Sequence, residues 1–191
     1  RLTGKQSVNR LVSSTVDESS TDVRFENADL SELYEMDYLD ELVCGIKSGK
    51  EASVYLGRNS TGFVAVKLYT DLRVRSFKHD EAYRTGRFIG DARVEKAIEH
   101  RSQKGLVAHQ SLWVQEEFRQ MKYLYEHGVR VPKAVAANGM ALVMEFIGDE
   151  DGNPAPRISD LKMARAQAEE AFRQSVQNLK RIVKAGRVTG D

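Results

Sequence analysis

The chain has 191 residues, of which 41% are hydrophobic and 30% are charged, with only three prolines. This composition is typical of a folded globular protein and excludes a disordered or fibrous one. The 29 basic and 28 acidic residues nearly cancel. The total charge therefore gives no reason to expect a nucleic acid or a membrane as a general partner, and any such binding would need a local patch.

The single cysteine, Cys44, excludes an internal disulfide and a thiolate metal cluster, and it fits a reducing compartment. Residues 1–14 lack the apolar stretch of a signal peptide. The longest apolar run, 140–144, is far too short to span a bilayer. We therefore expect a cytoplasmic protein that does not enter a membrane.

Along the chain, residues 1–24 are rich in Ser, Thr and charged side chains without a helical or strand period, which predicts a flexible tail. A short amphipathic helix that leads into a strand at 42–44 is predicted next, from the helical spacing of Leu30, Leu33, Leu39 and Leu42. The β-rich runs 53–58 and 63–69 then predict a hairpin, with 59–62 as a four-residue loop.

A second hairpin is predicted over 133–147, because Asn138-Gly139 supplies a tight turn between two apolar runs. Between the hairpins, one apolar stripe predicts a helix over 111–127 that Gly128 would end. The residues of this stripe are Val114, Phe118, Met121 and Tyr125. Residues 73–104 mix nine Lys/Arg with five Asp/Glu and two His, which predicts a long, flexible insertion before the helix.

The carboxyl-terminal part begins with an acidic turn, 149–154, which is typical of a linker between two lobes. A long helix is predicted over 159–185, with Phe172, Leu179 and Val183 on one stripe. The expected fold is therefore α+β. An amino-terminal lobe, 25–148, would contain a twisted antiparallel sheet and one crossing helix, and 149–191 would hold the linker and the first helix of a helical lobe.

One strand carries a residue pattern suited to a nucleotide. In the run Val-Ala-Val-Lys over 64–67, Ala65 and Lys67 lie on the same face because side chains alternate along a strand. A small Ala can lie beneath a planar base while the lysine binds phosphate oxygens. The alternative is a lysine at a strand end that extends to water.

A carboxylate on the predicted helix strengthens the nucleotide interpretation. Glu117 could pair with Lys67 and hold it extended toward a ligand, and Glu116 is the competing candidate. We prefer Glu117 because Met121, four residues on, belongs to the core-facing stripe, whereas Glu116 is rotated by about 100° around the helix. The alternative is that both glutamates are solvated.

The segment 45–54 offers backbone amides and hydroxyls for phosphate, but it fits neither common phosphate loop. The pattern G-x-x-x-x-G-K-[ST] needs one more residue between the glycines and a Ser or Thr where Glu51 stands. The protein-kinase pattern G-x-G-x-x-G-x-V, aligned on Val54, leaves Gly49 as the only matched glycine. Both assignments therefore fail.

The run Ser-Gly-Lys-Glu-Ala-Ser-Val-Tyr over 48–55 does resemble the phosphate loop of the RIO family of atypical protein kinases. Residues 64–69 resemble its ATP-lysine strand, and Trp113 with 116–119 resembles its helix C. Residues 144–148 and 154–156 resemble its hinge. Order and spacing match over about 45–161, which makes the combination far more specific than any single motif.

The resemblance implies that the phosphates lie at the loop, that Glu117 orients Lys67 as a catalytic pair, and that 144–147 line the adenine. It also implies that 73–104 matches a flexible loop of the family. The residues that it places around the nucleotide are Ser48, Gly49, Lys50, Ser53, Val54, Ala65, Lys67, Met144, Glu145, Phe146, Ile147 and Pro156.

The implied activity is a serine/threonine kinase that moves the ATP γ-phosphoryl group to a hydroxyl, on a protein substrate or on itself, or an ATPase, with Mg²⁺ as cofactor. Asp191 would position the acceptor. The family's catalytic loop resembles His-Gly-Asp-Leu-Ser-x-x-Asn, and here Thr189 stands in place of the His. We expect no metal ligand within the chain, because the family's metal-binding residues follow the position of Asp191.

Two other functions fit the sequence. One is a non-catalytic scaffold in which bound ATP orders the insertion for a macromolecular partner, such as RNA or a ribosomal particle. Thr189 favours this alternative. The other is a nucleic-acid-binding protein, which the near-neutral total charge disfavours. For the insertion itself, a solvated basic surface and a partner-binding role stay equally open.

Overall fold

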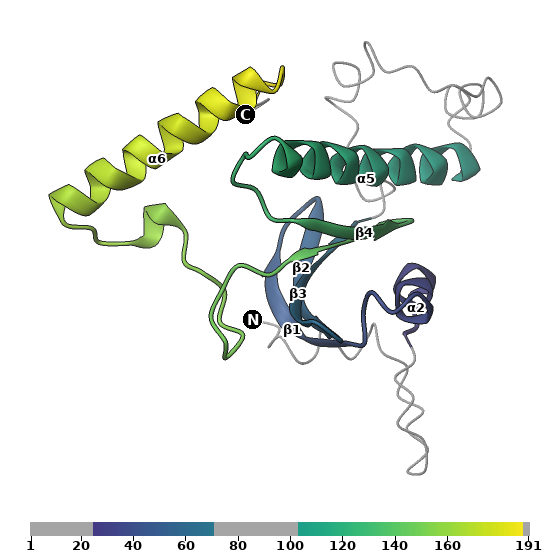
Figure 1. Cartoon of the computed structure of the whole chain (residues 1–191). Helices are drawn as coiled ribbons and strands as arrows, with labels where there is room; N and C mark the ends of the chain where they lie inside the picture. The colour runs from purple at the N-terminus through teal and green to yellow at the C-terminus, as the bar shows by residue number, and fades with distance from the viewer. Residues whose placement is uncertain (1–24, 71–102, 189–191) are drawn as a thin grey trace.

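The computed structural model describes residues 25–70 and 103–188, apart from the side chains of 103–110 (Figure 1). Its centre is a five-stranded antiparallel sheet in the order β1-β2-β3-β5-β4. The strands are β1 (Glu41–Ser48), β2 (Ala52–Asn59), β3 (Gly62–Tyr69), β4 (Ala134–Asn138) and β5 (Ala141–Glu145). The helices are α2 (Ala28–Glu35), α5 (Gln103–Glu126) and α6 (Arg165–Lys184), with a 3-10 helix η2 (Ile158–Asp160). The predicted tail, Asp191 and nearly all of the predicted insertion lie outside the described residues.

The two faces of the sheet carry different helices, as Figure 1 shows. One face packs against α2, where Leu30 and Leu33 share a buried core with Val64, Val66 and their neighbours on the other strands. On the opposite face of β3, the Lys67 side chain contacts Glu117 of α5. This division follows from the strand period of two, because Val64 and Val66 alternate with Ala65 and Lys67.

Helix α2 is shorter than the leucine spacing predicts. It begins after Asn27, whose side chain accepts a hydrogen bond from the Leu30 amide at 3.1 Å, and it ends at Glu35. Leu39 and Leu42 are buried in the same core, but Leu39 lies in the turn after the helix and Leu42 lies in β1. The predicted short helix and the predicted strand at 42–44 are both present, as α2 and as part of β1. The leucine spacing runs on past the end of the helix because leucines at near-helical spacing can also fill one core from different elements.

Both predicted hairpins are present, with one correction. Asn59, the last residue of β2, pairs with Gly62, the first residue of β3, so the loop has two residues and not four. The Asn59 side chain accepts a hydrogen bond from the Thr61 amide at 3.0 Å, which stabilises this tight turn. In the second hairpin Asn138 and Ala141 pair around Gly139, whose φ is +49°. Its first strand begins one residue after the predicted start at 133.

Helix α5 ends at Glu126, one residue before the predicted end and two before Gly128 with its φ of +74°, and it begins at Gln103 and not at 111. Residues 103–110 contain the helix-favouring types Gln, Lys, Leu and Ala, so the helix continues toward the amino terminus. The last two residues of the predicted insertion are therefore helical. On the predicted stripe Val114 is buried, whereas Tyr125 is exposed.

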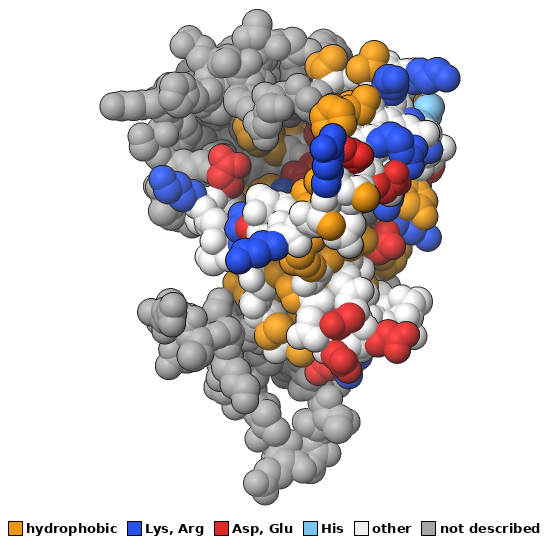
Figure 2. All heavy atoms as spheres, turned by 90° about the vertical axis from the view of Figure 1, so that its left-hand side faces the viewer, with side chains coloured by type: hydrophobic (Ala, Val, Ile, Leu, Met, Phe, Trp, Pro, Cys, Tyr) orange, Lys and Arg blue, Asp and Glu red, His pale blue; other side chains and the backbone are white. Residues whose placement is uncertain are grey.

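Helix α6 begins at Arg165, six residues later than predicted, and η2 precedes it. Its stripe of Phe172, Leu179 and Val183 is exposed. Figure 2 shows the side of the molecule on which α6 lies, where exposed apolar side chains stand among basic and acidic ones. The helix is fastened to the loop after α5 through polar contacts. Asn178 accepts from the Arg130 amide at 2.7 Å and donates to the Arg130 carbonyl at 3.2 Å.

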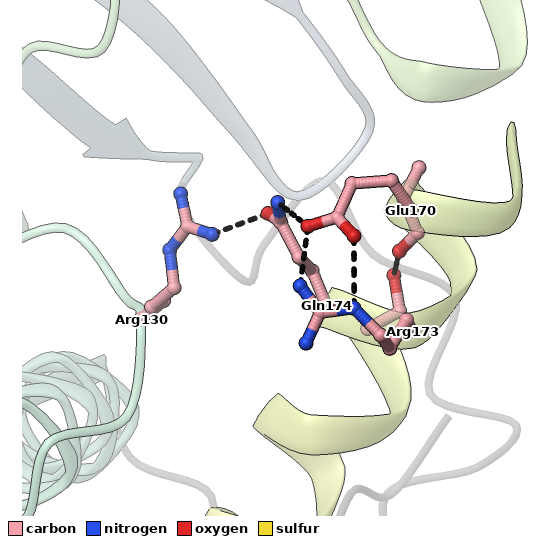
Figure 3. A network of polar contacts seen from close by, with 6 residues as sticks. Arg130, Glu170, Arg173 and Gln174 are labelled. Carbon is pink, nitrogen blue, oxygen red and sulfur yellow. Dashed lines mark hydrogen bonds and ion pairs between the residues drawn. The ribbon is translucent and has the colours of Figure 1, made fainter. Parts of the chain in front are cut away.

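A side-chain network extends this attachment (Figure 3). The Arg130 guanidinium donates to the side-chain Oε1 of Gln174 at 2.5 Å, and the side-chain Nε2 of Gln174 donates to Glu170 at 2.7 Å. Glu170 also forms an ion pair with Arg173. All of these contacts are exposed, so each adds little stability by itself. Together they connect α6 to the loop between α5 and β4.

Candidate active site

Lys67 and Glu117 form an ion pair between the sheet and α5. The Lys67 Nζ lies 2.7 Å from the Glu117 Oε1, although the residues are 50 positions apart in the chain. Their side chains are 26% and 36% exposed, so the pair is partly shielded from water and still reachable by a ligand. Glu116 instead contacts Gln120 and Arg119 on its own helix. Lys67 therefore pairs with Glu117 and not with Glu116, as predicted, while the role of this pair in binding a nucleotide stays a prediction.

Tyr69 completes this pair, and the sequence analysis missed it. Its hydroxyl donates a hydrogen bond to Glu117 Oε2, and its ring lies 4.6 Å from the Lys67 ammonium. Burial, followed by the hydrogen bond to Glu117, raises the pKa of the Tyr69 hydroxyl above its ordinary range. Tyr69 therefore stays a donor at physiological pH. The strand period that placed Lys67 could have found it, because residues 67 and 69 share a face.

The register of the sheet places four predicted nucleotide residues on one face. Val54 lies opposite Lys67 on β2, and Met144 lies opposite Ala65 on β5. Because cross-strand partners point to the same side, Val54, Ala65, Lys67 and Met144 line one surface. Ala65 is small and 6% exposed, so the surface beside the lysine is flat and apolar. A flat apolar surface suits a planar aromatic ligand.

The predicted phosphate loop is the turn of the β1–β2 hairpin. The Gly49 amide donates to the Ala52 carbonyl at 2.9 Å, and Lys50 is exposed at the tip. The Ser48 and Ser53 hydroxyls lie 3.0 Å apart. Ser53 pairs with Leu68 and not with Lys67, so the register turns both serines toward the other face of the sheet. Their contact with phosphate stays a prediction.

The predicted hinge follows β5 and folds back on the sheet. The Phe146 ring packs edge-on against Phe63, with centroids 6.0 Å apart. The Ala155 amide donates to the Ile147 carbonyl at 2.9 Å, while Ile147 itself is exposed. Glu145 is exposed and accepts a hydrogen bond from the Lys133 amide at 3.0 Å. This segment therefore borders the apolar surface around Ala65.

The acidic turn after the hinge is held against the same end of the sheet. Gly152, at a φ of +85°, is buried, and a Cβ there would meet Leu56 at 2.9 Å. Only a glycine fits this position without strain. Pro156 lies beyond the turn and is exposed. The turn therefore closes one end of the surface that carries Ala65 and Lys67.

In the described part of the chain, no three His, Cys, Asp or Glu side chains come together as metal ligands would. Asp191 lies outside this part, so its geometry is not placed. Within the same residues, every helix is too short or too polar to cross a bilayer. Lys67 contributes a positive charge to the site, and Glu117 balances it.

A family model described as the RIO domain matches residues 53–191, which is more than half of the chain. The chain belongs to the RIO family. Serine/threonine-protein kinase RIO1 of Caenorhabditis elegans is 31% identical over 72% of this chain and 25% of that protein. RIO-type serine/threonine-protein kinase Rio1 of Haloferax volcanii is 33% identical over 87% of this chain and 54% of that protein. This RIO domain thus spans a quarter to about half of the relatives that it matches.

A solved structure supports the fold of the RIO domain. The Rio2 kinase of Chaetomium thermophilum, in a complex with ADP, Mg²⁺ and phosphoaspartate, superposes with a TM-score of 0.56. The superposition covers 92% of this chain and 48% of the other, at 16% sequence identity. At 16% identity, the structural similarity shows only that the folds are alike. The expected α+β kinase-like lobe is therefore confirmed.

Proposed function

We propose that this RIO domain binds ATP on the sheet face that carries Ala65 and Lys67, as part of a RIO-type serine/threonine protein kinase. The observation that supports this most is the 2.7 Å ion pair between Lys67 and Glu117, joined by Tyr69. A lysine that only extends to water would not need a carboxylate partner whose other oxygen is held by a tyrosine. Kinase names of the relatives agree with this proposal.

The pair supplies a preorganised cation for phosphate. Glu117 holds the Lys67 side chain extended, and the Tyr69 hydroxyl fixes the other carboxylate oxygen. When phosphate oxygens arrive, the ammonium is already in place, so little side-chain entropy is lost on binding. The base would lie over Ala65 between Val54 and Met144, with the hinge segment 144–147 at its edge. The triphosphate would extend past Lys67 toward the turn at 48–53.

For the transfer step, we assign Asp191 to position the acceptor hydroxyl of a Ser or Thr, on a protein substrate or on the protein itself. Kinase-type transfer depends on positioning and on neutralising the phosphate charge, and Mg²⁺ supplies part of that neutralisation when it is bound. The described residues do not form a metal site. We assign no Mg²⁺ ligand to Lys67 or Glu117, because these two side chains form an ion pair with each other.

The proposed compartment is the cytoplasm, which fits a chain whose one cysteine, Cys44, is unpaired. ATP hydrolysis without a protein acceptor would use the same nucleotide site. A macromolecular partner such as RNA or a ribosomal particle stays a prediction that depends on residues 73–104, nearly all of which lie outside the described part. Binding that weakens steeply with added salt would support an RNA partner.

The experiment that tests the ATP site compares Lys67→Ala with Lys122→Ala by isothermal calorimetry. Lys122 is exposed on α5, so its replacement removes the same charge away from the site. We expect Lys67→Ala to weaken ATP binding by at least about tenfold, since a hydrogen bond to a charged group contributes about 1.5–3 kcal/mol. Lys122→Ala should bind ATP like the unaltered chain. Equal affinities of all three, at unchanged melting temperature, would place the nucleotide elsewhere.

A further inference from the structure

The two serines of the β1–β2 hairpin lie on the face of the sheet that packs against α2. Ser48 pairs with Ser53, and their hydroxyls are 3.0 Å apart. Ser53 pairs in turn with Leu68, which packs against the core that α2 shares with the sheet. Cross-strand partners point to the same side of a sheet, and neighbours along a strand point to opposite sides. Both hydroxyls therefore lie on the side away from Lys67.

Lys47 of the same hairpin lies on the face that carries Lys67. It pairs with Val54 on β2, and Val54 pairs with Lys67 on β3. The three side chains therefore form one row across three neighbouring strands. Adjacent strands are about 4.8 Å apart, so the backbones of the two lysines are separated by about 10 Å. The row thus presents two cations with a small apolar side chain between them.

A register shift in β1 brings Lys47 to this face. Gly45 pairs with Tyr55, which belongs to the buried core. The pairing then shifts by one residue, and Lys47 pairs with Val54. Residues two apart on a regular strand share a face, so without the extra residue Ile46 the Lys47 side chain would point toward the core like Gly45. Such bulges are frequent next to active sites, where they redirect a side chain.

The charge of Lys47 is available to a ligand. The side chain is exposed, and in the described part of the chain no carboxylate lies within ion-pair distance of it, whereas Glu117 balances Lys67. The pKa of the Asp160 carboxyl in η2 is lowered chiefly by a hydrogen bond from Arg157, and the positive charge of Lys47 adds to this lowering. Lys47 therefore lies within electrostatic reach of the segment that follows the hinge.

We propose that Lys47 is a second phosphate-binding residue of the ATP site, and that the hairpin offers the phosphates this lysine and not its serine hydroxyls. This inference rests on the proposed ATP site. With the base over Ala65, the phosphates would lie above Val54, between the ammonium groups of Lys47 and Lys67. A chain of phosphates can contact both cations, whereas a nucleoside without phosphates contacts neither.

The test measures ATP and adenosine binding to the full-length protein by isothermal calorimetry, with the melting temperature of every variant. We expect Lys47→Ala to weaken ATP binding at least about fivefold and adenosine binding less than about twofold, because only the phosphates contact the lysine. Lys47→Arg keeps the charge and should bind ATP within about twofold of the unaltered protein. Lys122→Ala, which removes an exposed charge on α5, is the matched control. Equal losses for ATP and adenosine in Lys47→Ala would indicate a structural effect and overturn the inference.

A variant with both Ser48→Ala and Ser53→Ala decides between the lysine and the hydroxyls. We expect it to lose less ATP affinity than Lys47→Ala, because the serines lie on the other face. An equal or larger loss in the serine variant, or an unchanged ATP affinity in Lys47→Ala, would overturn the inference. The proposed ATP site would still stand if Lys67→Ala weakens ATP binding. If Lys67→Ala binds ATP like the unaltered protein, the site and the inference fall together.

Discussion

The hydroxyl of Tyr69 donates to the carboxylate oxygen of Glu117 that is turned away from Lys67. One carboxylate therefore holds both a neutral donor and a cation, and the tyrosine ring lies under that cation. This geometry explains how a glutamate that is 36% exposed can keep a single orientation. We therefore expect the loss of the Tyr69 hydroxyl to weaken nucleotide binding.

Tyr69→Phe should weaken ATP binding without unfolding the chain. The change removes the hydroxyl and keeps the ring beneath Lys67, so Glu117 loses one of its two fixed partners. We expect the affinity to fall about fivefold, equivalent to about 1 kcal/mol for a partly exposed hydrogen bond. Calorimetry with ATP measures this, and Tyr125→Phe is the control because Tyr125 is exposed on the same helix as Glu117. Unchanged affinity in Tyr69→Phe would show that Glu117 needs no second partner.

The raised pKa of Tyr69 predicts a pH dependence of stability. In the folded chain burial and Glu117 keep the hydroxyl protonated, whereas in the unfolded chain it loses its proton near pH 10. Above about pH 10 the unfolded state binds fewer protons than the folded state, so the free energy of unfolding falls as pH rises. This contribution is fully present at lower pH. Urea unfolding between about pH 9 and 11 should show a steeper loss for the unaltered chain than for Tyr69→Phe. Parallel pH profiles would contradict the shift.

Two apolar substitutions should separate the core from the exposed stripe of α6. Leu33 is 1% exposed between α2 and the sheet, whereas Phe172 is 71% exposed on α6. Leu33→Ala should lower the free energy of unfolding by about 3 kcal/mol, because it leaves a cavity in a closed core. Phe172→Ala should change it by less than about 0.5 kcal/mol. Urea denaturation measures both values, and a large loss in Phe172→Ala would mean that this side chain is covered in solution.

The core of the proposed site could be predicted from local patterns. The strand period of two puts Ala65 and Lys67 on one face, and the helical rotation distinguishes Glu117 from Glu116. Each rule needs only residues that are close in the chain. The pairing of Lys67 with Glu117 could then be predicted once one helix was expected to cross the sheet. The binding roles of both residues remain predictions.

The remaining contacts depend on distances that local patterns do not contain. Tyr69 shares the face of Lys67, but its reach to Glu117 depends on how closely α5 approaches the end of β3. Asp29 on α2 accepts a hydrogen bond from the Met140 amide at 2.8 Å, across 111 positions of the chain. The contact of Arg187 with Gln120 spans 67 positions. Such contacts arise from the packing of whole elements.

Helix α2 and strand β1 must both be kept when a shorter fragment of this protein is prepared. The match to the RIO domain begins at Ser53, inside β2, so a fragment cut at that point would lack both elements. Val64, Val66 and Val143 would then face water, and β2 would become an open edge with unpaired backbone groups. A piece with such a surface would tend to aggregate. The folding unit therefore includes Phe25, which lies 28 residues ahead of the limit that sequence similarity indicates.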